Sequence, residues 1–285
     1  MTRRTLILRL PRPAATVWLL VLMLWWIVGC GRPGGTPRPN PPVEARPLPP
    51  LRIAAASDLQ AVLPKLADRF QSLRGFGITP TFLSSGVLAQ QIKQGAPYDL
   101  FLAANEAFVQ DLAAGGFIRP ESVRAYARGT LVLAVYGELG GRVGSLADLL
   151  RPEVRKIALA NPETAPYGKA GKQALERAGL WEKLRSKIVI AESVRQALLY
   201  AQKGDAEVAL VGRAIADVPE VRTVELDPRL YDPIVQALGI VTDSPRRADA
   251  EAFANFVLNE EGRAILEAFG FKPAGVDRPP SDRAG

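Results

Sequence analysis

Four positions in the sequence lie where a predicted strand ends and a predicted helix begins, and each could supply hydrogen-bond donors to one ligand. These positions are Ser57, Ser85, Tyr167 and Val194. The first turn of a helix has N–H groups without intrahelical partners and carries a partial positive charge, so helix starts attract anions. The hydroxyl groups of Ser57 and Ser85 add further donors. Because a fully ionised tetrahedral oxyanion has four acceptor oxygens and no donor, these positions together predict a site for such an ion.

The elements that would position these residues follow a regular pattern from residue 51 to about residue 275. Short apolar runs alternate with amphipathic stretches, which indicates an α/β fold with a mostly parallel sheet. We expect strands at 51–56, 78–83, 99–102, 131–136, 156–160, 187–191, 207–211, 223–226 and 234–241. A helix with Leu59 and Phe70 on its apolar face is expected directly after Ser57. Ligands of such folds bind at the carboxyl ends of strands, so the four junctions can meet in one cleft.

The composition excludes several classes of function. The chain of 285 residues contains no histidine, which removes the usual general base, the usual zinc ligand and the Ser-His-Asp arrangement. Cys30 is the one cysteine, so neither a disulfide within the chain nor a cysteine metal cluster can form. Residues 1–50 contain seven arginines and one acid, which leaves +1 of the net charge of +7 for the remainder. A nearly neutral folded part lacks the basic surface of a nucleic-acid-binding protein, so no nucleic-acid partner is expected.

Residues 1–29 have the layout of a lipoprotein signal peptide, with arginines before an apolar run of about fifteen residues. This run is shorter than the roughly 20 residues that span a bilayer as a helix, although an uncleaved membrane helix is the alternative. The sequence Ile-Val-Gly-Cys at its end resembles a lipobox, which implies that Cys30 becomes the lipidated N-terminus. Residues 30–50 contain eight prolines and indicate an extended tether. Residues 276–285 are expected to be a disordered tail.

Four sequence motifs resemble those of the molybdate-binding periplasmic proteins, the substrate-binding components of molybdate and tungstate ABC transporters. The motifs are AAASDL at 54–59, LSSGVLAQQIKQGAPYDLFLAAN at 83–105, ANPETAPYGKAGKQAL at 160–175 and SVRQAL at 193–198. The resemblance covers about residues 51–274. It implies a type II periplasmic binding fold, in which two α/β lobes joined by a two-strand hinge close on the ligand. Lobe 1 would comprise 51–130 and 237–275, lobe 2 would comprise 131–236, and the crossings would lie near 128–132 and 233–237.

The resemblance also assigns roles to single residues. Ser57 and Ser85 would contact the oxyanion through hydroxyl and backbone N–H groups, and Tyr167 and Val194 through backbone N–H groups. Molybdate or tungstate would be held by its oxygens, without direct metal-ion ligands and without a cofactor. The implied protein is a monomeric receptor, not an enzyme, that is lipid-anchored on the outer side of the cytoplasmic membrane. Its partner would be the permease of an ABC importer.

One position departs from the family pattern. Well-known family members carry a tyrosine hydroxyl donor after a strand of the second lobe, and the aligned residue here is Gly212. Arg213 or Tyr231 could supply a substitute donor, although a solvated Arg213 is the simpler expectation. Asp99 and Asn105 also match family positions. A structural role is expected for both, because an acid that faced a dianion would repel it.

Three alternatives remain open at the level of sequence. The same fold could bind another oxyanion, sulfate or phosphate, because size selection depends on a cavity that a sequence does not display. A secreted serine hydrolase would use Ser84 or Ser85 as nucleophile and Lys93 as base, but Lys93 lies in a polar run where solvation is expected. An effector-sensing module would need an attached domain, which the remaining residues are not expected to form.

Overall fold

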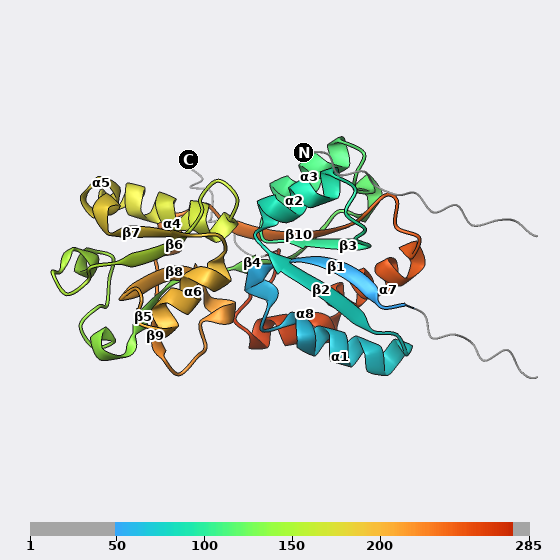
Figure 1. The fold of residues 1–285 in the computed structure, drawn as a ribbon. Helices are drawn as coiled ribbons and strands as arrows, with labels where there is room; N and C mark the ends of the chain where they lie inside the picture. The colour runs from blue at the N-terminus through green and yellow to red at the C-terminus, as the bar shows by residue number, and fades with distance from the viewer. Residues whose placement is uncertain (1–48, 276–285) are drawn as a thin grey trace, which may run out of the picture. The chain divides into compact units, whose positions relative to one another are not determined.

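The computed structural model describes residues 49–275, and this range contains two five-stranded sheets with helices packed against them (Figure 1). The predicted signal peptide, Cys30 and nearly all of the tether lie outside the described residues, as does the predicted tail at 276–285. Among the helices of residues 49–275, none has both the length and the apolar character needed to cross a membrane.

The first sheet has a parallel half and an antiparallel half. Its strands, in spatial order, are β2 (Ile78–Leu83), β1 (Leu51–Ala56), β3 (Leu100–Ala103), β10 (Ile234–Ile240) and β4 (Arg124–Gly129). β1 is parallel to β2 and β3, whereas β10 is antiparallel to β3 and β4. β4 was not predicted, because two arginines interrupt its apolar alternation.

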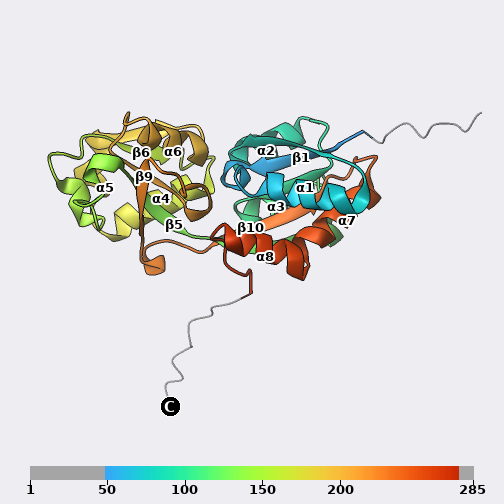
Figure 2. The same cartoon turned by 90° about the horizontal axis from the view of Figure 1, so that it is seen from below.

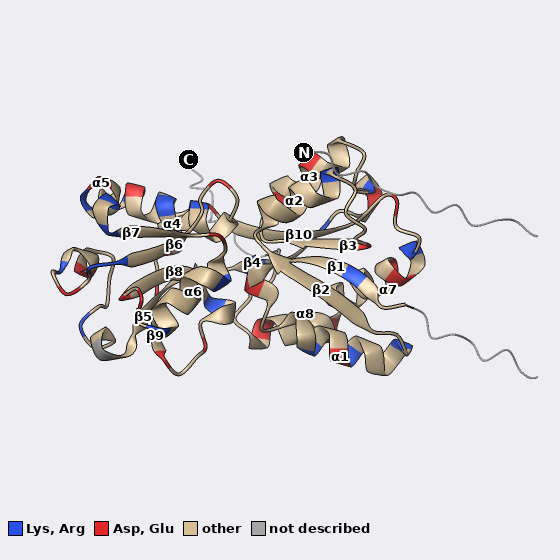
Figure 3. Ribbon diagram, in the orientation of Figure 1, with Lys and Arg blue, Asp and Glu red and all other residues tan. Residues whose placement is uncertain are grey.

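The second sheet repeats this arrangement. Its strands, in spatial order, are β7 (Ile188–Ala191), β6 (Ile157–Ala160), β8 (Val208–Gly212), β5 (Leu131–Tyr136) and β9 (Val221–Glu225). β6 is parallel to β7 and β8, and β5 is antiparallel to β8 and β9. Strands β3, β5, β6, β8 and β10 carry no charged residue (Figure 3). Such apolar strands are typical of sheets that helices cover on both faces.

Helices cover both faces of the first sheet, and alternate residues of β1 point to opposite sides. The helices are α1 (Leu63–Arg74), α2 (Ser85–Lys93), α3 (Glu106–Ala114), α4 (Pro166–Arg177), α5 (Trp181–Leu184), α6 (Val194–Gln202), α7 (Arg247–Leu258) and α8 (Glu260–Ala268). Ile53 packs in the core with α1, α7 and α8, whereas Ala54 packs in the core with α2 and α3. The core of the second sheet includes buried residues of α4 and α6.

The chain passes between the sheets at two neighbouring places. Thr130 alone separates β4 from β5, and the return connection runs from the end of β9 to the start of β10. Ile234, the first residue of β10, pairs with Gly129 in the first sheet while its side chain packs in the core of the second. Figure 2 shows β5 and β10 near the junction of the two halves. Two adjacent strand connections are the arrangement of a hinge.

The segment after Ser57 differs from the prediction of an immediate α-helix. A single 3-10 turn, η1 (Ser57–Leu59), follows β1, and α1 begins only at Leu63. Pro64 explains this start, because proline fits the first turn of a helix, where its missing N–H is not needed. Ser57 therefore lies on a short turn and not at the start of a long helix.

Candidate anion-binding site

The four residues singled out from the sequence surround one small cavity. Ser57 and Ser85 line it from the first sheet and its helices, and Tyr167 and Val194 line it from the second. The side chains are buried, with at most 4% of any of these residues exposed. The volume of the cavity is about 10 Å³, which is roughly the space that one water molecule requires. The structure thus brings together donors from both halves of the fold in a closed arrangement.

The start of α2 supplies two serine hydroxyls to this cavity. Ser85 Oγ accepts a hydrogen bond from the N–H of Ala104 at 3.0 Å, so the hydroxyl proton of Ser85 remains available. Ser84 is the N-cap of α2 but makes no capping hydrogen bond, although serine at this position usually accepts one. Its Oγ is buried, has no partner and belongs to a residue that lines the cavity.

A direct contact between the two halves lies beside these serines. The N–H of Gly86 donates to the carbonyl oxygen of Thr164 at 2.9 Å. A Cβ at position 86 would lie 2.9 Å from that oxygen and 3.0 Å from Thr164 Cα. The backbone can approach this closely only because residue 86 is glycine.

Two helix starts face the cavity from the second half. Tyr167 follows Pro166 at the start of α4, where backbone N–H groups have no intrahelical partner. Gly168 lets this helix begin close to β6, because a Cβ there would lie 2.1 Å from the carbonyl oxygen of Ala160. Val194 begins α6, and the preceding Ser193 caps it by accepting a hydrogen bond from the N–H of Gln196 at 3.2 Å. Both helix starts can donate backbone N–H groups to an anion.

A buried polar cluster lies next to the cavity, and the sequence did not predict it. Asp58, which lines the cavity, is fully buried, and its carboxylate accepts a hydrogen bond from Gln236, while its Oδ1 has no partner. Gln236 Nε2 also donates to the Tyr167 hydroxyl at 3.2 Å, and Gln236 Oε1 accepts from the Tyr126 hydroxyl at 2.6 Å. Every polar group of the Gln236 side chain is therefore paired.

Burial changes the acidity of this cluster. It raises the pKa of Asp58 from 3.8 to about 6, and the hydrogen bond from Gln236 and the nearby Tyr167 hydroxyl offset only part of that rise. Burial and the nearby Asp58 carboxylate also raise the pKa of Tyr126 and of Tyr167 well above the usual value. Both phenols are therefore neutral hydrogen-bond donors at physiological pH.

The side chain of Tyr167 fills the space beside Gly212. A Cβ at position 212 would lie 2.8 Å from Tyr167 Cζ, and a Cβ at position 129 would lie 2.0 Å from the Tyr167 hydroxyl. Gly129 and Gly212 thus form a recess that accommodates the phenol. Tyr167 is consequently more than a source of a backbone N–H, because its ring occupies the place where a side chain at position 212 would lie.

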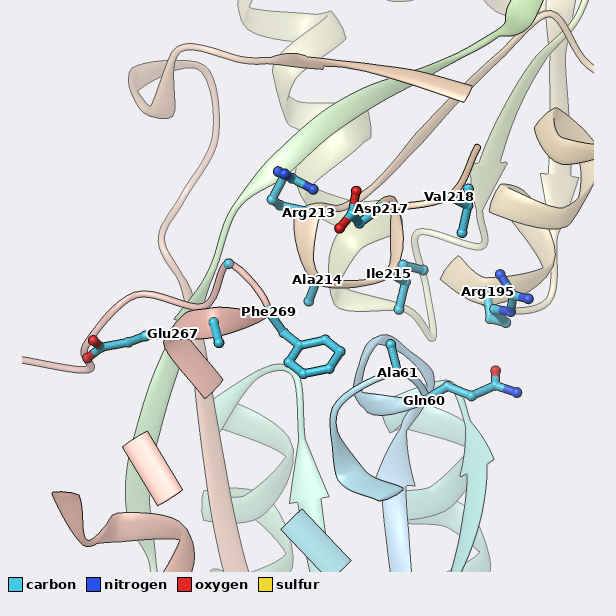
Figure 4. A pocket seen from close by; sticks show the side chains of 12 residues that line it. Gln60, Ala61, Arg195, Arg213, Ala214, Ile215, Asp217, Val218, Glu267 and Phe269 are labelled. Atoms are coloured by element: carbon cyan, nitrogen blue, oxygen red, sulfur yellow. The ribbon is translucent and has the colours of Figure 1, made fainter. Parts of the chain in front are cut away.

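The two suggested substitutes for a tyrosine at position 212 do not line the small cavity. Arg213 lines a separate, larger pocket of about 700 Å³, shown in Figure 4, together with Gln60, Arg195, Asp217 and Phe269. Backbone contacts fix the position of Arg213. Its N–H donates to the Thr130 carbonyl, and the residue is the first of a 3-10 turn. The Tyr231 hydroxyl instead accepts a hydrogen bond from the Leu131 N–H at 3.1 Å.

Asp99 and Asn105 make structural contacts. Asp99 accepts hydrogen bonds from the Arg52 N–H at 2.8 Å and from the Ser244 hydroxyl at 2.7 Å. Asn105 caps α3 by accepting a hydrogen bond from the Ala107 N–H at 2.8 Å. These contacts hold the start of β3 and the start of α3.

The proposed hydrolase pair is too far apart for proton transfer. Ser84 precedes the first turn of α2, and Lys93 is exposed at the last turn. A helix rises 1.5 Å per residue, so α2 separates the two residues by about 13 Å along its axis. Lys93 therefore cannot act as a base for Ser84 in this arrangement. Residues 49–275 also contain no group of three or more Asp, Glu, Cys or His side chains that could hold a metal ion.

Two α/β halves that enclose a donor-lined cavity at a two-strand hinge define a ligand receptor. The chain matches the bacterial extracellular solute-binding proteins over residues 51–272 and belongs to that family. It is 33% identical to YvgL of Bacillus subtilis (strain 168), a putative ABC transporter substrate-binding lipoprotein, over 78% of this chain and 85% of that one. It is 29% identical to the molybdate-binding protein ModA of Rhodobacter capsulatus over 76% of this chain and 86% of that one.

A solved structure supports the same fold. The periplasmic molybdate-binding protein of Azotobacter vinelandii is 34% identical, with a TM-score of 0.73, and the match covers 78% of this chain and 98% of that one. The predicted type II periplasmic binding fold is therefore confirmed.

Proposed function

We propose that the protein is an extracytoplasmic receptor that binds molybdate or tungstate and delivers it to the permease of an ABC importer. The observation that carries this proposal is the convergence of uncharged donors from both halves of the fold on one cavity. The names of the related proteins, which include molybdate-binding proteins and an ABC transporter substrate-binding lipoprotein, support it. The oxyanion is the cargo of this receptor and not a cofactor.

In the proposed complex the anion is held by hydrogen bonds alone. Ser57 and Ser85 donate through their hydroxyl groups, and Tyr167 and Val194 donate through backbone N–H groups. We add Ser84, because its buried hydroxyl has no protein partner beside the cavity. Such donors complement a fully ionised oxyanion, whereas the proton of a monoprotonated ion would face another donor. Hydrogen bonds to a charged acceptor are stronger than neutral ones, so no cation is required.

Binding requires a movement of the two halves. A tetrahedral oxyanion is larger than the cavity volume of about 10 Å³, which accommodates roughly one water molecule. The halves must therefore separate at Thr130 and the start of β10 to admit the ion and then close around it. Sulfate has the same donor requirements, and we propose that cavity size selects against it. Phosphate keeps at least one proton near neutral pH, and that proton would face a donor. Calorimetric titration with molybdate, tungstate, sulfate and phosphate tests this choice.

We also propose that Cys30 carries a lipid that retains the receptor at the outer face of the cytoplasmic membrane, where it acts as a monomer. The lipobox resemblance and the lipoprotein relative support the lipid anchor. Each buried CH₂ of an acyl chain contributes about 0.8 kcal/mol to membrane binding, so a multiply acylated cysteine remains bound. Cys30→Ala should move the protein from the membrane fraction to the soluble extracytoplasmic fraction. Tight membrane association of this variant would contradict the anchor.

A further inference from the structure

The Gln236 side chain connects parts of the chain that lie far apart in sequence. Gln236 is fully buried in β10, the strand that returns from the second half to the first. Its amide nitrogen donates to Asp58, 178 residues away, and to the Tyr167 hydroxyl, 69 residues away. Asp58 follows Ser57 on η1, and Tyr167 begins α4. One amide group thus contacts both of the segments that supply donors to the cavity from opposite halves.

The hydrogen bond between Gln236 and the Tyr167 hydroxyl depends on closure of the two halves. Asp58 and Gln236 both belong to the first half, because η1 continues β1 and β10 pairs with β3 and β4. Tyr167 belongs to the second half, because α4 packs in the core of that sheet. When the halves separate, the Tyr167 hydroxyl moves away from Gln236, while the hydrogen bond between Gln236 and Asp58 can persist. The closed form therefore gains a buried hydrogen bond between Gln236 and the Tyr167 hydroxyl.

The recess for the phenol also involves both halves. Gly129 lies at the end of β4 in the first sheet, and Gly212 lies at the end of β8 in the second. A side chain at either position would overlap the Tyr167 ring or hydroxyl. The ring consequently reaches the hinge, where small relative movements of the two sheets change its surroundings.

We propose that the Tyr167 hydroxyl, with Gln236 and Asp58, forms a closure latch that sets the lifetime of the bound anion. The three residues are positioning residues: they stabilise the closed arrangement of the donors, and only the backbone of Tyr167 is assigned to the anion itself. This inference rests on the proposed function and extends it from the identity of the donors to the rate of release.

The test compares two tyrosines that contact the same glutamine. Tyr167→Phe removes the hydroxyl that bridges the halves but keeps the backbone N–H assigned to the anion. Tyr126→Phe removes a hydroxyl of similar burial that donates to Gln236 Oε1 from β4, the neighbour of β10 in the same sheet. Purified wild-type protein and both variants are loaded with radiolabelled molybdate and chased with excess unlabelled molybdate. The association rate is measured in parallel, and unfolding by urea is measured without ligand.

Tyr167→Phe should release molybdate at least about fivefold faster, the effect of losing one net hydrogen bond, with an almost unchanged association rate. Tyr126→Phe should lower stability to urea but leave the release rate unchanged. An unchanged release rate in Tyr167→Phe, or an equal increase in both variants, would overturn the latch.

A second variant keeps every polar group of the cluster. Gly212→Ala places a Cβ 2.8 Å from Tyr167 Cζ, so the ring must shift, and release should be faster in this variant too. If Tyr167→Phe does not fold, Gly212→Ala decides the question by the same chase. If the wild type does not bind molybdate, the release experiment uses whichever of tungstate, sulfate or phosphate it binds. The lack of molybdate binding then counts against the proposed ligand and not against the latch. If it binds none of these, the proposed function and the latch are both wrong.

Discussion

The phenol of Tyr167 lies in the space that a side chain at Gly212 would occupy, 2.8 Å from the position of its Cβ. This relationship gives a physical reason for the glycine at position 212, where the sequence resemblance implies a tyrosine. A side chain at position 212 and the ring of Tyr167 would compete for the same volume. The tyrosine hydroxyl at this location comes from α4, and it accepts a hydrogen bond from Gln236.

Gly86→Ala should weaken anion binding more than it lowers stability. The added Cβ would meet the carbonyl oxygen of Thr164 at 2.9 Å, a contact that exists only while the two halves are closed. The open form is not affected, so we expect a loss of affinity of about tenfold or more, from overpacking that costs roughly 1–3 kcal/mol. Calorimetric titration measures the affinity. Gly144→Ala is the matched control, because nothing lies within 4 Å of its Cβ, and an equal loss in that variant would refute the explanation.

Ser57→Ala and Ser85→Ala should each reduce affinity, but only the second should also lower stability. A hydrogen bond to a charged group contributes about 1.5–3 kcal/mol, so each variant should bind roughly 10- to 100-fold more weakly. Ser85 also accepts the Ala104 N–H, which the alanine would leave unpaired. The double variant should remain folded, as circular dichroism would show. Wild-type affinity in the folded double variant would remove both residues from the site.

Ser84→Ala should reduce affinity without a loss of stability. The Ser84 hydroxyl makes no capping hydrogen bond and is buried without a partner, so its removal breaks no protein contact. We expect an affinity loss of about fivefold or more and an unfolding free energy that is unchanged or slightly higher. Ser72→Ala is the control, because its exposed hydroxyl bonds only to the backbone of its own helix. If Ser84→Ala binds molybdate like the wild type, Ser84 is not a donor to the anion.

The stability of the protein should fall as the pH rises from about 4 to about 7, through the pKa of Asp58. This pKa is raised from 3.8 to about 6 on folding, so the folded state holds a proton that the unfolded state releases. The resulting stability is fully present below about pH 3.8 and is lost as the pH passes about 6. The pKa difference corresponds to a contribution on the order of 3 kcal/mol.

Urea unfolding of the wild type and of Asp58→Asn at several pH values isolates this contribution. As the pH rises through this range, the unfolding free energy of the wild type should fall relative to that of Asp58→Asn. Asp148 and Asp227 have the opposite effect on stability. Hydrogen bonds and ion pairs with arginine lower the pKa of each carboxyl to about 2. Their contribution to the stability of the folded state is therefore lost only below about pH 4. A difference that does not vary with pH would show that Asp58 titrates normally.

Much of the fold could be predicted from local patterns. The apolar runs placed most strands within one or two residues, and the strand ends identified four of the residues that line the cavity. β4 was missed because arginines occupy two of its six positions. The start of α1 was placed too early because the apolar spacing continues through η1, and only Pro64 marks the true first turn.

The buried cluster could not be predicted, because it depends on contacts between distant segments. Gln236 is a single polar residue in an otherwise apolar strand, which is a signal for a buried hydrogen bond but does not name its partners. Asp58 adjoins a predicted donor, and its burial becomes evident only when η1 and β10 are packed together. The recess formed by Gly129 and Gly212 likewise requires the two sheets to be placed side by side.

Calorimetric titration of the purified protein with molybdate and tungstate, with sulfate and phosphate in parallel, tests the central claim most directly. The account predicts one tight site for molybdate or tungstate, weaker binding of the smaller ions, and a large loss of affinity in the Ser57→Ala, Ser85→Ala double variant. Absence of heat from molybdate and tungstate, or full affinity in the double variant, would contradict it.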